Sequence, residues 1–275
     1  MGLALDHGMI QAFSPDTGCR TGNECEGGRM RTVRRLLVAA TLLSLSVSAE
    51  AQSMRHCRAK PQLLELGAPL PIAREAVTEL KHLRIVTLGS SSTAAYGVSN
   101  PVYAYPAQLN IGLEKALPGV NVEVLNRVIG DQDVEHMAAR MRADMVPRLP
   151  SLMIWQTGTD AAMHHVPLDI FERRLRERIG IGKSLGADFV LMSLQYVPAV
   201  VALPDEEEYE RVMAGVAREL GVGLFRRFDI MRSWYDDGMP YAEYVQLDGL
   251  HLNDFGQKCI GRLLTRSILG AVSSP

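Results

Sequence analysis

From residue 83 onward, short apolar runs alternate with longer amphipathic stretches, and this alternation limits the fold more than any other feature. The short runs are rich in β-branched and large apolar residues and end at turn-forming residues, as buried strands do. They cover residues 83–88, 122–126, 152–156, 188–194 and 222–225. Because strands that alternate with helices form parallel sheets, we expect a doubly wound, three-layer α/β/α domain with about five strands.

The stretches between these runs have helical spacing. Gly186 and Gly221 are suited to end two of the helices, and Asn253 is a good N-cap for the last one. The predicted helices cover residues 105–117, 131–145, 168–185, 206–220 and 254 to about 269.

Chemically useful side chains follow the predicted strands. Residues 89–93 read Gly-Ser-Ser-Ser-Thr after the first strand, and Asp248-Gly-Leu-His251 precedes the last helix. In a doubly wound sheet, ligands bind beyond the carboxyl ends of the strands, so we expect these segments to converge there. A serine, a histidine and a carboxylate are the minimum set for acyl transfer through a covalent intermediate.

Each motif alone has a simpler interpretation. A Gly/Ser/Thr cluster often only forms a turn, and His251 could be an ordinary loop histidine. A phosphate-binding loop is disfavoured, because the lysine of a P-loop and the glycine spacing of a dinucleotide fingerprint are both missing. The convergence of several motifs at one sheet edge is stronger evidence than any one of them.

The chain resembles the SGNH (GDSL-like) hydrolase superfamily from about residue 83 to the C-terminus. The motif at 89–93 matches the first sequence block, with Ser91 at the nucleophile position, and Asp248-x-x-His251 matches the last. Asn-Arg-Val-Ile-Gly130 resembles the second block, one residue short, and Gly-Thr-Asp160 stands where the family has Gly-x-Asn. The resemblance implies a flavodoxin-like fold and a Ser91–His251–Asp248 triad. It also implies an oxyanion hole made from Ser91, Gly130 and the residue at position 160.

Asp160 departs from the family pattern in a way that matters chemically. The family's asparagine donates an N–H to the oxyanion, whereas an ionised aspartate only accepts hydrogen bonds and would repel the charge. Three interpretations stay open at this point. Asp160 could be desolvated, protonated and a donor; the hole could use only the Ser91 and Gly130 N–H groups; or the protein could be a weak or lapsed hydrolase.

The predicted function is therefore an exported serine esterase that hydrolyses a small acyl ester, such as an acetyl ester, and that needs no cofactor or metal. The expected substrate is a small-molecule or carbohydrate ester. The alternatives are an O-acyltransferase acting on envelope carbohydrate and a glycan-binding pseudo-hydrolase. A formal net charge of −2 does not favour nucleic-acid binding. Chain length does not determine the oligomeric state.

The N-terminal region reads as a bacterial export signal. Residues 30–35 are basic, 36–47 are apolar, and Ala49-Glu-Ala51 has small residues at the positions that signal peptidase reads. We expect cleavage after Ala51, a periplasmic or secreted protein and no stable membrane span; an uncleaved anchor is the alternative. Residues 1–29 fit no targeting pattern and are interpreted as a disordered, mis-assigned upstream start. Residues 52–80 form an N-terminal arm and 81–275 the hydrolase domain.

Two of the four cysteines, Cys57 and Cys259, remain in the predicted mature chain. In an oxidising compartment this pair is a candidate disulfide between the arm and the last helix. The alternative is two separate thiols, because two cysteines carry no framework pattern.

Overall fold

A parallel sheet of five strands organises the computed structural model, which describes residues 57–127 and 149–273. The strand order is β2-β1-β3-β4-β5, and every neighbouring pair is parallel. The strands are β1 (His82–Leu88), β2 (Asn121–Asn126), β3 (Leu152–Gln156), β4 (Asp188–Met192) and β5 (Gly223–Phe225). All residues of β3 and β4 are buried, as expected for central strands covered on both faces.

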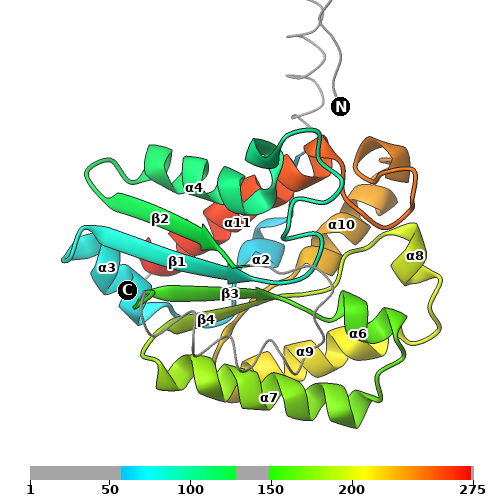
Figure 1. The fold of residues 1–275 in the computed structure, drawn as a ribbon, viewed down its shortest axis with the longest axis horizontal. Coiled ribbons are helices and arrows are strands. Elements are labelled where there is room, and N and C mark those ends of the chain that lie inside the picture. Colours follow the sequence, from blue (N-terminus) through cyan, green and yellow to red (C-terminus); the bar gives the residue numbers. More distant parts are fainter. Residues whose placement is uncertain (1–56, 128–148, 274–275) are drawn as a thin grey trace, which may run out of the picture. The chain divides into compact units, whose positions relative to one another are not determined.

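Helices cover both faces of this sheet (Figure 1). Helices α4 and α11 lie side by side on one side, where α3 also packs, and α7 and α9 pack together on the other. Shorter helices lie in the connections. The helices are α2 (Pro61–Leu64), α3 (Pro71–Thr78), η2 (Pro101–Tyr103), α4 (Tyr105–Ala116), α6 (Thr159–Met163), α7 (Leu168–Ser184), α8 (Pro198–Val201), α9 (Glu206–Leu220), α10 (Arg227–Asp236), η3 (Tyr241–Glu243) and α11 (Asp254–Ser273).

The predicted three-layer α/β/α fold is confirmed, with differences at the ends of elements. Strand β4 stops two residues earlier than expected, because the Leu194 N–H donates to the Glu210 carboxylate at 2.7 Å instead of continuing the sheet. The last helix continues to Ser273, and Asn253 caps it by accepting from Gly256 N at 3.0 Å. The helix expected at 131–145 lies outside the described residues.

Helix α10 was missed by the sequence patterns. No side chain caps its N-terminus, so it has no start signal. Its apolar side chains Phe228, Met231 and Trp234 are buried in the core.

Residues 57–80 pack directly on the sheet. Leu66 and Leu70 belong to the hydrophobic core, and the Leu66 carbonyl accepts a hydrogen bond from Leu224 N of β5 at 2.8 Å. The Asp188 carboxylate at the start of β4 accepts from Ala73 N at 2.8 Å, in the first turn of α3. Burial raises the pKa of Asp188, and the backbone hydrogen bonds from Ala73 and Ile72 oppose this rise. The segment is therefore joined to the sheet through buried polar contacts as well as apolar ones.

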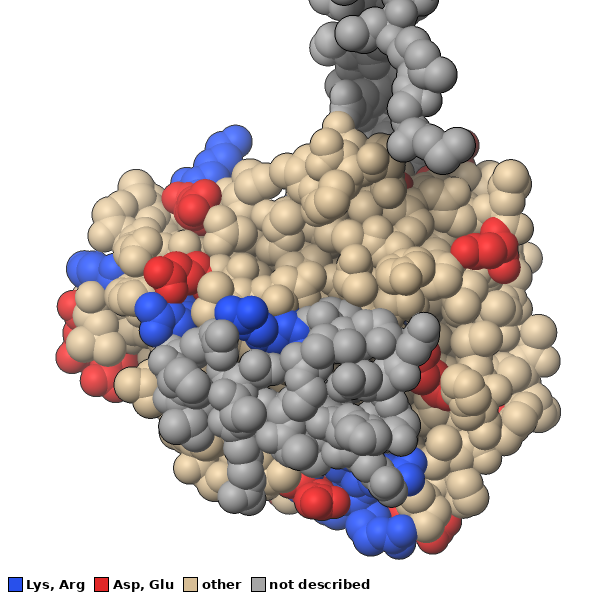
Figure 2. Space-filling view, viewed as in Figure 1, with Lys and Arg blue, Asp and Glu red and all other residues tan. Residues whose placement is uncertain are grey.

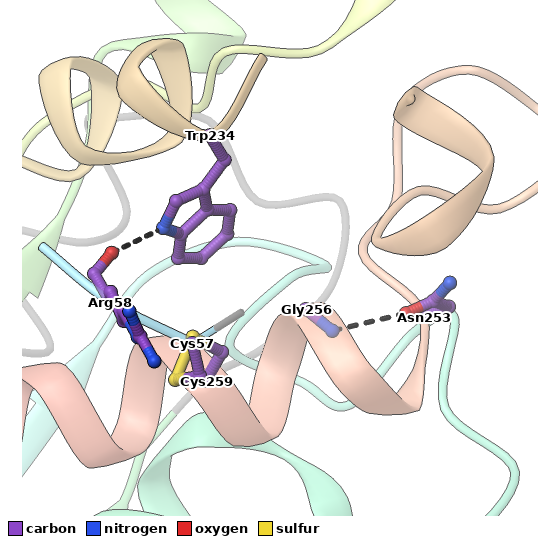
Figure 3. Close-up of a disulfide and its surroundings, with 6 residues drawn as sticks. All are labelled: Cys57, Arg58, Trp234, Asn253, Gly256 and Cys259. Carbon is purple, nitrogen blue, oxygen red and sulfur yellow. Dashed lines mark hydrogen bonds between the residues drawn. A yellow bond between two sulfur atoms is a disulfide. The ribbon is translucent and has the colours of Figure 1, made fainter. Parts of the chain in front are cut away.

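A disulfide joins Cys57 to Cys259 of α11, across 202 residues of sequence (Figure 3). Next to it, the Trp234 indole N–H donates to the Arg58 carbonyl at 2.7 Å. Cys259 is fully buried. These contacts anchor the beginning of the described chain to both α11 and α10.

Charged side chains form small, separated groups of both signs on the face drawn in Figure 2, and no continuous basic stripe crosses the atoms described there. None of the described helices combines the length and hydrophobicity needed to cross a membrane.

We expect the double variant Cys57→Ser/Cys259→Ser to lower the free energy of unfolding by about 2–4 kcal/mol, because the crosslink restricts the unfolded chain over a very long loop. Chemical denaturation of the oxidised protein and the variant measures this difference. Treating the parent with a thiol reductant should reproduce most of the loss. A reductant-treated parent as stable as the oxidised protein would contradict the prediction.

Candidate active site

The nucleophile loop, residues 89–93, follows the carboxyl end of β1. A Cβ atom on Gly89 would collide with Thr93 Oγ1 and lie 2.9 Å from Gln156 Oε1, so only glycine allows this turn. The Ser90 carbonyl accepts from Thr93 N at 2.9 Å and closes the turn. Ser91 stands at its partly exposed tip.

A second loop, residues 245–252, leads into α11 and carries Asp248 and His251. An isolated bridge between Val245 and Leu252 closes its base. Asp248 Oδ1 accepts from the N–H groups of Leu250 and His251, both at 2.9 Å. These two bonds leave the other carboxylate oxygen free to meet the imidazole.

Ser91, His251 and Asp248 form one continuous hydrogen-bonded chain. Asp248 Oδ2 lies 2.7 Å from His251 Nδ1, and His251 Nε2 lies 3.0 Å from Ser91 Oγ. Burial raises the pKa of Asp248, but the hydrogen bonds from Leu250 N and from the ring and backbone of His251 outweigh burial and lower its pKa overall. The carboxylate therefore stays ionised, as a group that orients and stabilises an imidazolium must.

Gln195, which follows β4, links the nucleophile loop to the histidine loop. Its Oε1 accepts from Ser92 Oγ at 3.3 Å, and its Nε2 donates to the Leu250 carbonyl at 2.7 Å. Ser92 is next to Ser91, and Leu250 is next to His251. One buried amide thus connects the chain neighbours of Ser91 and His251.

Three more amide side chains hold the nucleophile loop. Gln257 of α11 donates to the Ser92 carbonyl at 2.9 Å, and Asn126 at the end of β2 donates to the Thr93 carbonyl at 2.7 Å. Gln156 at the end of β3 accepts from Thr93 Oγ1 at 2.7 Å. Each amide comes from a different element, so the position of Ser91 depends on the whole sheet edge.

Two buried charged side chains lie behind the segment that carries Gln195. Arg227 Nε donates to the carbonyls of Ser193 and Leu194 at 3.0 and 3.2 Å. Burial lowers the pKa of Arg227 to about 10, while nearby Tyr105, Glu210 and Asp160 favour its charge. Burial raises the pKa of Glu210 to about 8 although Leu194 N donates to it. Burial thus disfavours the charged form of both groups, and each partner partly offsets this effect in the other.

The predicted oxyanion side is only partly described. Gly130 lies outside the described residues. The Ser91 N–H makes no hydrogen bond with any residue in 57–127 or 149–273. Asp160 lies in the first turn of α6 and is exposed.

The two chemical motifs and their convergence at the strand ends were predicted from the sequence, whereas the amide side chains that support the loop were not. Gln156 was visible only as a polar residue at the end of an apolar strand, and Gln195 only as a residue after a strand. Gln257 lies inside the predicted last helix and carries no signal. Within the described ranges, no group of three or more His, Cys, Asp and Glu side chains could hold a metal ion.

The five-stranded parallel sheet, with a serine loop after its first strand and an Asp-x-x-His loop before its last helix, defines the chain as a member of the SGNH hydrolase superfamily. The profile of the non-GDSL lipase-like family matches residues 56–274, and the chain belongs to this family. The comparison with curated proteins finds no match.

Solved structures share the fold at low sequence identity. A two-domain esterase, CEX, active on acetylated mannans and co-crystallised with mannopentaose, is 17% identical with a TM-score of 0.62; the match covers 75% of this chain and 55% of CEX. The protein therefore spans about half the length of that relative. TesA is 22% identical (TM-score 0.56; 68% and 97% covered). A variant of Axe2, an acetyl xylan esterase from Geobacillus stearothermophilus, is 18% identical (TM-score 0.57; 68% and 94% covered).

We expect Gln195→Leu to lower the free energy of unfolding by about 1–3 kcal/mol, because it removes both hydrogen bonds of the buried Gln195 amide and leaves the Ser92 hydroxyl and the Leu250 carbonyl without this partner. It should also lower kcat on a simple ester at least tenfold, since small displacements of reacting groups are costly. Thermal or chemical denaturation and steady-state kinetics measure the two effects. Ser92→Ala removes only one bond and should have a smaller effect on both. A Gln195→Leu protein with the parent's kcat would show that the link does not position the triad.

Proposed function

We propose that this protein is an exported serine esterase that removes small acyl groups, acetyl above all, from carbohydrate esters. The observation that carries the proposal is the unbroken chain from Ser91 Oγ through His251 to Asp248, with separations of 3.0 and 2.7 Å. A serine hydroxyl becomes a useful nucleophile only when a base takes its proton, and this chain supplies that base.

In the first half-reaction, Ser91 Oγ attacks the ester carbonyl carbon while its proton passes to His251 Nε2. The resulting tetrahedral oxyanion collapses, and the bond to the alcohol oxygen breaks. His251 gives its proton to this leaving oxygen, and the acyl group stays on Ser91. Asp248 remains ionised throughout and stabilises the transient imidazolium.

In the second half-reaction, His251 takes a proton from water, and the hydroxide oxygen attacks the acyl carbon. Collapse of the second tetrahedral oxyanion breaks the bond to Ser91 Oγ, and the proton on His251 returns to that oxygen. The products are a carboxylic acid and the free enzyme. The backbone N–H groups of Ser91 and Gly130 are the proposed oxyanion donors in both halves.

Substrate and compartment rest on separate lines of support. CEX acts on acetylated mannans and Axe2 on acetyl xylan, which favours acetyl groups on polysaccharides. The basic and apolar segments at 30–47, followed by Ala49-Glu-Ala51, support export. A disulfide between Cys57 and Cys259 suits an oxidising compartment.

A fluorophosphonate probe should label the mature protein at Ser91, and Ser91→Ala should abolish the label and lower ester hydrolysis by at least about 10³-fold. Labelling detected by mass spectrometry and hydrolysis of ethyl acetate measure these outcomes. The matched control is Ser90→Ala, one residue away in the same loop, which should still be labelled. An unlabelled parent that hydrolyses no acetate would refute the esterase proposal and favour a glycan-binding pseudo-hydrolase.

Asp160→Asn should raise kcat on a simple ester several-fold or more, because an amide can donate to the oxyanion whereas an ionised carboxylate repels it. Steady-state hydrolysis of ethyl acetate measures the change. Asp169→Asn is the control, since it removes an exposed carboxylate from the first turn of α7. If Asp160→Asn is no faster than the parent, Asp160 does not limit the oxyanion hole.

A further inference from the structure

Tyr96 presents an exposed aromatic ring beside the proposed general base. Tyr96 is 58% exposed, and the centroid of its ring lies 5.8 Å from the centroid of the His251 ring, with the two ring planes inclined by 30°. Buried Tyr105, by comparison, bonds to Thr93 through its hydroxyl. An aromatic ring left open to solvent next to a reacting group suggests a surface on which substrate packs.

The backbone on both sides of Tyr96 has the left-handed conformation. Ala95 has φ +71° and Gly97 has φ +88°. A Cβ on Gly97 would collide with the Leu252 carbonyl and lie 2.9 Å from His251 Cβ. The Tyr96 N–H donates to the Ser91 carbonyl at 3.1 Å. A non-glycine residue such as Ala95 rarely adopts this conformation, and such strain is concentrated at functional sites.

An open groove of about 590 Å³ begins at the residue after Tyr96. Residues 97–99, Gln246 and residues 253–255 line it. Its wall combines polar and apolar surface: Asp254 accepts from Ser99 N at 2.7 Å and from Ser99 Oγ at 2.6 Å, and the Gln246 amide donates to the Gly97 carbonyl. Gly97, the next residue in the chain after Tyr96, therefore belongs to a groove whose wall carries hydrogen-bonding groups.

The position of His251 decides which half of an ester lies here. His251 Nε2 must protonate the leaving alcohol oxygen, so that oxygen lies within hydrogen-bond distance of the imidazole. The group attached to it then extends over the surface next to the imidazole, to which the Tyr96 ring belongs. The carbonyl oxygen of the acyl group points instead toward the N–H groups of the proposed oxyanion hole.

We propose that Tyr96 and this groove form the binding site for the alcohol half of the substrate, and that this half is a pyranose ring within an oligosaccharide. One face of a pyranose is made of C–H groups and can pack flat on an aromatic ring, while its hydroxyl groups can donate to the carboxylate and carbonyl oxygens of the groove wall, which accept more than one hydrogen bond each. An aliphatic alcohol could make no such additional hydrogen bonds. The inference rests on the proposed esterase function and specifies its substrate.

The kinetic test compares Tyr96→Ala with the parent on acetylated xylo- and manno-oligosaccharides, with ethyl and hexyl acetate as non-sugar references. We expect kcat/KM for the acetylated tetrasaccharides to fall at least tenfold more than kcat/KM for ethyl acetate, mainly through KM. Tyr96→Trp should keep the sugar preference. In the parent, KM should decrease from acetylated mono- to tetrasaccharides as the groove fills. Ile111→Ala, which trims an exposed side chain on α4, is the control.

A binding test separates this inference from the catalytic proposal. In the Ser91→Ala background, calorimetry with xylotetraose and mannotetraose should show binding that Tyr96→Ala weakens at least tenfold, whether or not the parent hydrolyses esters. Equal losses on ethyl acetate and sugar acetates would mean that Tyr96 only positions His251, and would overturn the proposal. A parent that prefers hexyl acetate, or a Ser91→Ala protein that binds neither tetrasaccharide at millimolar concentration, would also overturn it.

Discussion

Burial of polar atoms behind the nucleophile loop is the constraint on which the rest of this structure depends. The loop at 89–93 turns so tightly that the carbonyl and hydroxyl groups of Ser92 and Thr93 are turned into the protein, where each unpaired group would be costly. Amide side chains from β2, β3, α11 and the segment after β4 pair with them. The hydrogen bonds that compensate for the burial of these polar groups therefore also determine the position of Ser91.

Helix α11 connects this constraint to both ends of the described chain. It begins directly after the histidine loop, its Gln257 reaches the nucleophile loop, and its Cys259 is bonded to Cys57. Packing of α11 against α4 and α3 thus helps to position His251 and the loop of Ser91 and holds the N-terminal segment in place. Folding of the N-terminal segment and organisation of the site are coupled through one helix.

Sequence patterns predicted the positions of the five strands along the chain well, because strands that are buried on both faces appear as continuous apolar runs. Ser91, Asp248 and His251 could be selected because their motifs follow strand ends or precede a helix. Asp160 was recognised as an exception only through the resemblance to a family. Helix α10 was missed because a helix without a capping side chain leaves no local start signal.

The sequence by itself determined the α/β class and the two chemical motifs at 89–93 and 248–251, since each depends on residue type and local spacing. Only the tertiary structure decided that Gln195 bridges the two reactive loops and that Tyr96 stays exposed beside His251. Such pairs are more than 50 residues apart in the chain, and their contacts depend on strand order, helix packing and backbone strain that no local pattern records.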